Sequence, residues 1–344
     1  MQRAWWTWTA AAAVLAAVAV ASSGDALAKK PGGGGGGGGG GNTSPPDIAF
    51  TMLDETLYVV QDDGTGVEAL ASASGRASWS PDGTQIAFWS DVDGPGIYVV
   101  DVAGGQPVKV AATNKTWPDS SWVAWSPAPA PDGQVKLAFV DWPLNADGSV
   151  GGIGSWSDIF LVNLDGTGRE NVTETSGHER EISWSPDARQ LACSTAQRIG
   201  VLDLSRRDAS GLPTRHIVYS GSAGADQAEW AKTGGRIVFS AGNGAAVNPL
   251  HDLFVLDVAY SEALGSWTGS TPVNITNTPD DEERAPSWSP DDSRVVCQNA
   301  QWRSSRKGRA TLSLEVVTVN TGVRSTLLGG DLQRNYPVWK RSVP

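Results

Sequence analysis

The chain of 344 residues has only two cysteines and three histidines. Two cysteines cannot build the disulfide framework of a small secreted domain, and His178, His216 and His251 lack the spacing of metal ligands. No Gly-x-Ser-x-Gly motif occurs, which argues against a serine-hydrolase nucleophile. The nearest string, GSWTG at residues 265–269, lacks the central serine, and we predict that it lies in a turn.

Positive charge is also scarce, because 26 Lys and Arg face 37 Asp and Glu, for a formal net charge of −11. An acidic surface without a basic patch does not suit nucleic acid or anionic lipid. The one local basic stretch, residues 303–309, is interpreted as a solvated loop tip. We therefore expect a partner that is a protein or a glycan of the cell envelope, no cofactor, no nucleic acid, and a monomeric chain.

The N-terminal segment has the features of an export signal. Residues 1–28 contain Arg3, an apolar run from Ala10 to Ala21, and a small-residue site that ends at Ala28. The run is shorter than the roughly 20 residues of a membrane span, so we predict cleavage after Ala28, a periplasmic or secreted protein, and no integral membrane span afterwards. An uncleaved anchor is the alternative. Residues 29–46, with glycine from Gly32 to Gly41, are predicted to form a flexible linker.

The rest of the chain repeats one pattern, which is clearest in SWSPDGTQIAF at residues 78–88. Degraded copies follow at intervals of 46, 59, 46, 58 and 51 residues. They begin at Trp79, Trp125, Trp184, Trp230, Trp288 and Trp339. An internal period of this size indicates a repeat architecture.

Each copy predicts one four-stranded unit. Pro-Asp-Gly is a hairpin turn, and the apolar and alternating runs after it are strands without helical periodicity, as in the blade of a β-propeller. The first unit, from Asp47, has no Trp strand before it, whereas Pro337 to Lys340 is a Trp strand with nothing after it. The C-terminal strand should therefore complete the first blade of an all-β, six-bladed propeller that spans residues 47–341.

The pattern WSPDG-x-x-IAF, followed by IYVVD and Gly, resembles the TolB-type propeller repeat, a relative of the WD repeat, over Asp47 to Lys340. TolB carries an α/β domain before its propeller, whereas a Gly-rich segment stands there in this chain. The resemblance implies a propeller and a docking site for a partner, or for the protein's own N-terminus, at the mouth of the channel. It does not by itself imply an activity.

The predicted site is the channel rim on the face that carries the long second-to-third strand loops, since functional loops are often long. The segments before each Trp strand should form this rim. Their candidate binding residues are Arg76, Trp122, His178, Arg180, Glu181, Asp226, Gln227, Glu283, Arg284, Arg334, Asn335 and Tyr336. Mixed charges beside aromatic side chains favour a peptide or a sugar over a single ion. Six tryptophans lie in or beside the loops of this face and favour a recognition surface, namely Trp122 and also Trp89, Trp117, Trp142, Trp156 and Trp302.

Three alternatives stay open at this point. An enzyme, a lyase or hydrolase, could use Glu181, Asp226 and Glu283 at the channel mouth, and a structural envelope protein would have one stable partner. Asp91 and Asp93, or Asn145 and Asp147, could bind calcium, although Asp, Asn and Gly also form tight turns. We predict a non-catalytic binding module. Cys193 and Cys297, which stand where other repeats have Phe, are predicted to be buried free thiols.

Overall fold

A computed structural model describes residues 46–52, 54–114, 122–144, 157–174, 178–195, 197–221, 224–243, 250–301, 310–330 and 336–341. The predicted signal peptide and nearly all of the predicted linker lie outside these residues. The described part of the chain contains strands and turns, and no helix is assigned in it. The all-β prediction is therefore confirmed.

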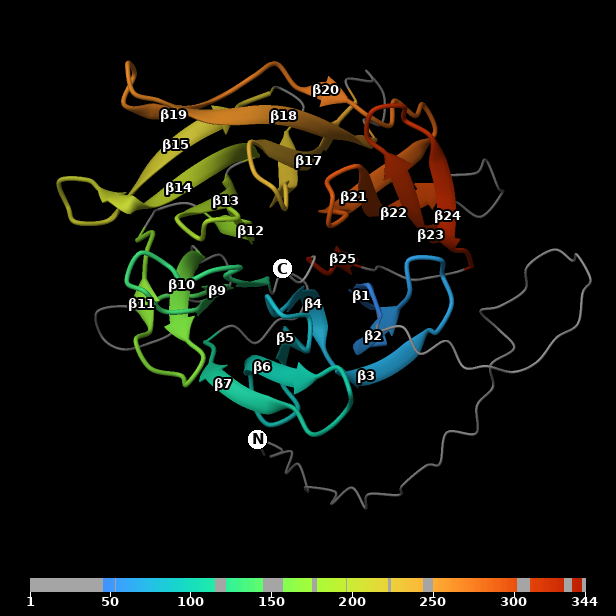
Figure 1. The fold of residues 1–344 in the computed structure, drawn as a ribbon, viewed down its shortest axis with the longest axis horizontal. Coiled ribbons are helices and arrows are strands. Elements are labelled where there is room, and N and C mark those ends of the chain that lie inside the picture. The colour runs from blue at the N-terminus through green and yellow to red at the C-terminus, as the bar shows by residue number, and fades with distance from the viewer. Residues whose placement is uncertain are drawn as a thin grey trace, which may run out of the picture. The chain divides into compact units, whose positions relative to one another are not determined.

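Six antiparallel sheets surround a common centre (Figure 1). In the first sheet the strand order is β25-β1-β2-β3, so the last strand of the chain completes the first blade, as the repeats predict. The first blade consists of β25 (Val338–Trp339), β1 (Ile48–Thr51), β2 (Thr56–Val60) and β3 (Glu68–Ser72), and the second of β4 (Ser74–Trp79), β5 (Gln85–Ser90), β6 (Gly96–Asp101) and β7 (Val108–Ala112). The third blade consists of β8 (Val123–Trp125), β9 (Lys136–Asp141), β10 (Asp158–Asn163) and β11 (Glu170–Asn171), and the fourth of β12 (Glu179–Trp184), β13 (Gln190–Thr195), β14 (Arg198–Arg207) and β15 (Pro213–Tyr219). The fifth blade consists of β16 (Ala225–Trp230), β17 (Arg236–Gly242), β18 (His251–Ser261), β19 (Ser266–Gly269) and β20 (Val273–Asn274), and the sixth of β21 (Asp281–Trp288), β22 (Arg294–Gln301), β23 (Thr311–Thr318) and β24 (Arg324–Leu328).

In four blades the hairpin that follows the repeat tryptophan is held by its own side chains. Ser80 Oγ donates to Asp82 Oδ1 at 2.6 Å and accepts from the backbone N–H of Gln85, the first residue of β5, at 2.9 Å. The serines at 126, 185 and 289 accept the equivalent N–H in their blades. The motif therefore fixes where the second strand begins, because the serine bonds to that strand's first amide.

In three blades the serine that precedes the repeat tryptophan joins the blade to its neighbour. Ser78 Oγ accepts the N–H of Trp125 at 2.9 Å, Ser183 Oγ that of Trp230 at 2.6 Å, and Ser287 Oγ that of Trp339 at 2.9 Å. Apolar clusters also fill each of the six interfaces between blades. The core of the protein is thus divided into six layers between sheets rather than enclosed in one.

The two cysteines are free and buried, as predicted, and the cross-strand pairs explain their position. In four blades a phenylalanine of the second strand lies opposite an aromatic residue of the third, as in Phe139 with Phe160 at 5.8 Å between ring centroids. Cys193 instead lies opposite Gly200, and Cys297 opposite Glu315. The aromatic pair is therefore lost from both partners at once.

One prediction about the fifth blade is wrong. Gly265 ends a turn, but Ser266–Gly269 form the strand β19, which pairs with the second half of the long strand β18. Trp267 packs edge to face against Trp230, with 5.5 Å between ring centroids, and its indole N–H donates to Asp203 Oδ2 at 3.1 Å. The packing of Trp267 and its hydrogen bond to the fourth blade explain why this polar, Gly-flanked segment forms a strand.

Candidate functional site

The propeller has two faces with different connections. The hairpins that join first to second and third to fourth strands lie on one face, which we call the turn face. The connections between blades and between second and third strands lie on the other, which we call the loop face. Those predicted binding residues that the structure describes lie near the start of an inner strand or just before it, so they belong to the loop face or to the channel beneath it.

Four of the predicted residues line one cavity of about 290 Å³ between the fourth and fifth blades, which we call the loop-face pocket. His178, Arg180 and Glu181 come from β12 and the residue before it, and Asp226 comes from the start of β16. The remaining wall consists of Ser194, Thr195, Gln197 and Ala225. The pocket therefore combines charges of both signs with hydroxyl and amide groups.

A repeated β-bulge positions Glu181. The pairing of β12 with β13 shifts between Arg180 and Ser183, and Glu181 has a φ of 56°, in the left-handed region that residues other than glycine rarely adopt. Gln227 occupies the same place in the fifth blade, also with φ 56°. The bulge turns these side chains away from the regular alternation of the strand.

The two bulge residues make the same hydrogen bond to the next blade. A carboxylate oxygen of Glu181 accepts the backbone N–H of Gln227, and Gln227 Oε1 accepts that of Ala285 at 2.7 Å. A neutral amide is therefore sufficient for the structural task. The carboxylate at 181 adds a negative charge that the bulge itself does not require.

That charge is unfavourable for folding. Glu181 is 7% exposed, and burial, together with the negative charge of Asp226, raises the pKa of Glu181 to about 7. The N–H of Gln227 opposes this rise only in part. Carboxyl groups with strongly raised pKa values in a cavity are typical of functional sites.

We predict that Glu181→Gln stabilises the protein at pH 8 and flattens its stability profile. Between pH 4.5 and about 7 the folded wild type holds a proton that the unfolded chain has released, so its stability falls as pH rises. Glutamine retains the acceptor and removes the charge, which should raise the free energy of unfolding by about 1–3 kcal/mol at pH 8 and much less at pH 4.5. Urea denaturation at several pH values measures this.

The control for this variant is Glu262→Gln, at a side chain that is 85% exposed in the β18–β19 hairpin. Its stability should follow that of the wild type at every pH. A Glu181→Gln protein that is less stable than the wild type at pH 8 would show that the carboxylate is stabilised in the fold.

Arg284 extends the pocket toward the sixth blade. Its NH1 lies 3.1 Å from Asp226 Oδ2 and its Nε lies 2.7 Å from Glu282 Oε1, while its NH2 donates to His251 Nδ1 at 2.8 Å. The other oxygen of Asp226, Oδ1, is buried and makes no hydrogen bond to any described residue. One carboxylate oxygen at the edge of the pocket is thus left for a ligand.

Other predicted rim residues are hidden from a partner. Arg76 and Trp122 are each 4% exposed; the guanidinium of Arg76 lies over the Trp122 ring at 5.2 Å, and the Trp122 ring packs edge to face against Tyr336 at 5.7 Å. Gln227 is 7% exposed. These buried side chains therefore present little surface to a partner.

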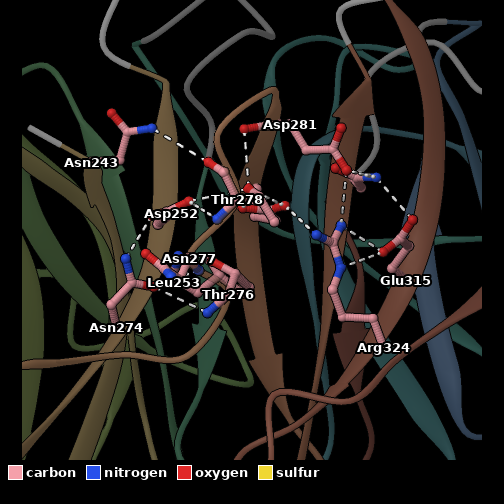
Figure 2. Close-up of polar contacts among 12 residues, drawn as sticks. Asn243, Asp252, Leu253, Asn274, Thr276, Asn277, Thr278, Asp281, Glu315 and Arg324 are labelled. Carbon is pink, nitrogen blue, oxygen red and sulfur yellow. Dashed lines mark hydrogen bonds and ion pairs between the residues drawn. The ribbon is translucent and has the colours of Figure 1, made fainter. Parts of the chain in front are cut away.

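Glu283 belongs to a separate network of polar contacts in the fifth and sixth blades, of which Figure 2 shows the part from Asp252 and Thr278 to Arg324. It pairs with Arg324 at 2.9 Å and accepts from Thr278 Oγ1 at 3.0 Å, and Thr278 also donates to Asp252. Figure 2 shows Arg324 reaching Glu315 on its other side, at 2.7 Å. Burial raises the pKa of Glu283 to about 7 although Arg324 and Thr278 oppose this rise. The convergence of Glu283 with Glu181 and Asp226 in one catalytic site is therefore not supported.

The remaining candidates divide in the same way. Trp89 is buried and donates to Thr113 Oγ1 at 3.1 Å, and Trp142 is half-buried. Arg334, Asn335, Trp117, Trp156, Trp302 and the string with Asn145 and Asp147 lie outside the described residues. The Asp91–Gly94 string forms a turn in which Lys109 Nζ contacts the carbonyl oxygens of Asp93 and Gly94 at 2.9 Å.

Ser194, Thr195 and Gln197 were not anticipated as pocket residues. They lie where β13 ends and β14 begins at Arg198, the shortest second-to-third strand connection among the later blades. A short connection leaves the strand ends uncovered, so a cavity remains. In the sequence this connection is a short loop between longer ones, so a search for long loops selects the loops on either side and misses it.

No three or more His, Cys, Asp or Glu side chains are grouped for a metal ion anywhere in the described ranges. Within the same ranges there is also no helix long and apolar enough to cross a membrane.

The fold of the chain is similar to the six-bladed propeller of TolB proteins. The crystal structure of TolB from Acinetobacter baumannii superposes with a TM-score of 0.58 at 18% sequence identity, over 86% of this chain and 67% of that one. The structure of a putative TolB from Agrobacterium tumefaciens gives 0.53 at 17% identity, over 87% of this chain and 99% of that one. No protein-family profile and no curated protein matches the sequence. The similarity therefore concerns the fold.

Proposed function

We propose that the protein is a non-catalytic binding module of the cell envelope that recognises a segment of a partner protein at the loop-face pocket. The observation that carries the proposal is the charge on Glu181, since Gln227 performs the same structural task without one. Arg180, which is exposed, and Asp226, with one unpartnered oxygen, provide groups for a charged or polar segment. The similarity to TolB propellers and the predicted signal peptide support an exported location, with the Gly-rich segment as a tether.

A protein segment suits the pocket better than a glycan. Sugar rings are commonly bound by stacking on aromatic faces, and the eight residues that line the pocket include no Trp, Tyr or Phe. Two carboxylates, an arginine and a histidine offer ion pairs and hydrogen bonds to side chains and backbone instead. The lining is therefore suited to a peptide segment that carries charges of both signs.

We expect Asp226→Asn and Arg180→Gln each to weaken partner binding by about 1–3 kcal/mol, roughly 5- to 150-fold in Kd, as at interface hot spots. Proteins captured from an envelope extract of the source organism by immobilised wild type are identified by mass spectrometry, and the captured partner is then titrated against each variant by calorimetry. Glu262→Gln, a charge-matched change on the turn face, should bind like the wild type.

Equal losses from Glu262→Gln and Asp226→Asn would contradict the location of the site. Binding to a glycan array that requires Asp226 would replace the peptide with a sugar. One stable partner whose capture is unchanged in all pocket variants would indicate a structural envelope protein.

N-terminal sequencing of the protein from a periplasmic or culture fraction should begin at Lys29 if the signal is cleaved as proposed.

An enzyme is the second candidate, because a carboxyl group with pKa about 7 beside Asp226 and His178 could transfer protons. If the protein is an enzyme, it should turn over a peptide or polysaccharide substrate, and Glu181→Gln should abolish this turnover while substrate binding is retained. The binding module predicts no turnover by either protein.

A further inference from the structure

The axis of the propeller contains a second cavity, of about 50 Å³, which we call the axial cavity. Inner strands of five blades line it, and the sixth contributes the carbonyl of Pro286, which accepts from Arg76 NH2 at 2.9 Å. The charged residues in its wall are Arg76, Glu229, Lys232 and Arg341. A volume of this size holds a few waters or one small ion with water.

The wall of the axial cavity has an excess of positive charge. Glu229 pairs with Arg76 and, at 2.6 Å, with Lys232, whereas Arg341, among the described residues, donates to the carbonyl oxygens of Lys232 at 3.0 Å and Trp184 at 3.4 Å and to no carboxylate. The next carboxylate, Asp292, is already bonded to the amides of Lys232 and Thr233. Three cations thus face one carboxylate in the wall, or two with Asp292 included.

The same wall contains donors without acceptors. Arg76 NH1, Trp125 Nε1 and Trp230 Nε1 are buried and have no hydrogen-bond partner among the described residues. Buried donors are nearly always satisfied in folded proteins, and exceptions mark a bound water or ion. Burial lowers the pKa of both Lys232 and Arg341, because each cation loses water there, and Glu229 opposes the fall at both.

The sequence places these charges at equivalent positions. Lys232 and Arg341 each stand two residues after a repeat tryptophan, where the four intact copies have the proline of WSP. The two most degraded copies, WAK and WKR, therefore differ from the others by placing a cation at the axis. This is a specific replacement that points to a ligand, because repeat decay alone has no reason to place two buried cations around one cavity.

We propose that the axial cavity is a binding site for a small inorganic anion, of the size and charge of chloride, held by Arg76, Lys232 and Arg341 with the indole N–H groups of Trp125 and Trp230. The anion supplies the acceptor that the three unpartnered donors lack. It also offsets the excess of cations in the wall. The site lies apart from the loop-face pocket, so it does not depend on the proposed partner.

Bromide tests the proposal directly. Crystals of the wild-type protein soaked in sodium bromide should show an anomalous peak in the axial cavity, within hydrogen-bonding distance of Arg76 NH1. In solution, Tm should be higher in bromide or chloride than in gluconate at the same ionic strength, by about 5 °C at a hundredfold excess over Kd. Gluconate is too large for the cavity and serves as the matched salt.

Arg341→Gln should weaken bromide binding at least tenfold, measured as the bromide concentration that gives half of the Tm shift. Arg294→Gln is the control, because Arg294 carries the same charge and lies over the repeat tryptophan Trp339, but its side chain is 39% exposed and it does not line the cavity. If Arg341→Gln does not fold, the crystal and the wild-type Tm comparison decide alone. No anomalous peak together with equal Tm in bromide and gluconate would overturn the proposal and leave water in the cavity.

Discussion

Deleting residues 337–344 is expected to unfold the propeller or to lower its free energy of unfolding by more than about 5 kcal/mol, because the ring is closed by β25 alone. Val338 and Trp339 pair with Ala49 and Ile48 and are 7% and 2% exposed. Without them, β1 becomes an open sheet edge. The interfaces of the first blade with both of its neighbours also lose buried apolar surface.

The point variant Trp339→Ala should show a large part of the same effect. Truncation of a buried tryptophan typically costs about 3–5 kcal/mol, and here the main-chain bonds of the strand, such as Lys340 N–H to Asp47 O at 2.8 Å, remain possible. Urea denaturation followed by circular dichroism measures the loss.

Trp267→Ala is the matched control for Trp339→Ala. Trp267 is half-buried in the peripheral β19 strand, away from the closure, and its truncation should cost less. Equal losses from the two variants would show that closure adds nothing beyond the burial of one tryptophan. A synthetic peptide of residues 336–344 should restore the transition of the truncated chain.

The repeats allowed the blade count and the closure to be predicted because they report local chemistry. The serine and aspartate of WSPD bond within a single hairpin, so each copy defines its own turn wherever it occurs. Four strands per copy then leave one strand too few at the start and one too many at the end. None of these steps requires knowledge of contacts between distant residues.

The site could be predicted only in part, since its geometry depends on contacts between blades. The rim was assigned by position before each tryptophan, but a left-handed bulge at Glu181 and Gln227 decides which of those side chains reach the surface. Such a conformation is rare for residues other than glycine and leaves no mark in composition. Arg76 and Trp122 are buried because they stack on each other across two blades, which no local pattern shows.

Degraded repeats were interpreted as loss of pattern, whereas the structure shows altered chemistry at fixed positions. Glu229 stands where three other blades have the serine that accepts the next tryptophan's N–H, and it keeps a contact of 3.4 Å to the N–H of Trp288. It also adds a buried negative charge. The sequence does not show the role of this charge, because its partner Arg76 lies 153 residues earlier in the chain, in another blade.

Glu229→Gln is therefore expected to be among the most destabilising single changes in the protein, by about 3–5 kcal/mol, because it leaves Arg76 and Lys232 buried without their shared carboxylate. Burial opposes ionisation of Glu229, yet Lys232 and Arg76 outweigh it and hold its pKa below the usual value, so the pair is charged at neutral pH. Glutamine keeps an acceptor for Ser287 Oγ at nearly the same place. The loss of stability in Glu229→Gln therefore reports the missing charge of the side chain and not a change in its shape.

Two further measurements separate this effect from simple misfolding. The double variant Glu229→Gln with Lys232→Met should recover a large part of the loss, since removing both members of a buried ion pair is often nearly neutral whereas removing one is not. Sodium bromide should stabilise Glu229→Gln more than it stabilises the wild type, because an anion in the axial cavity then faces three cations and no carboxylate in the wall. If Glu229→Gln is as stable as the wild type in gluconate, the cations are solvated through the channel, and the central ion pair contributes little to the fold.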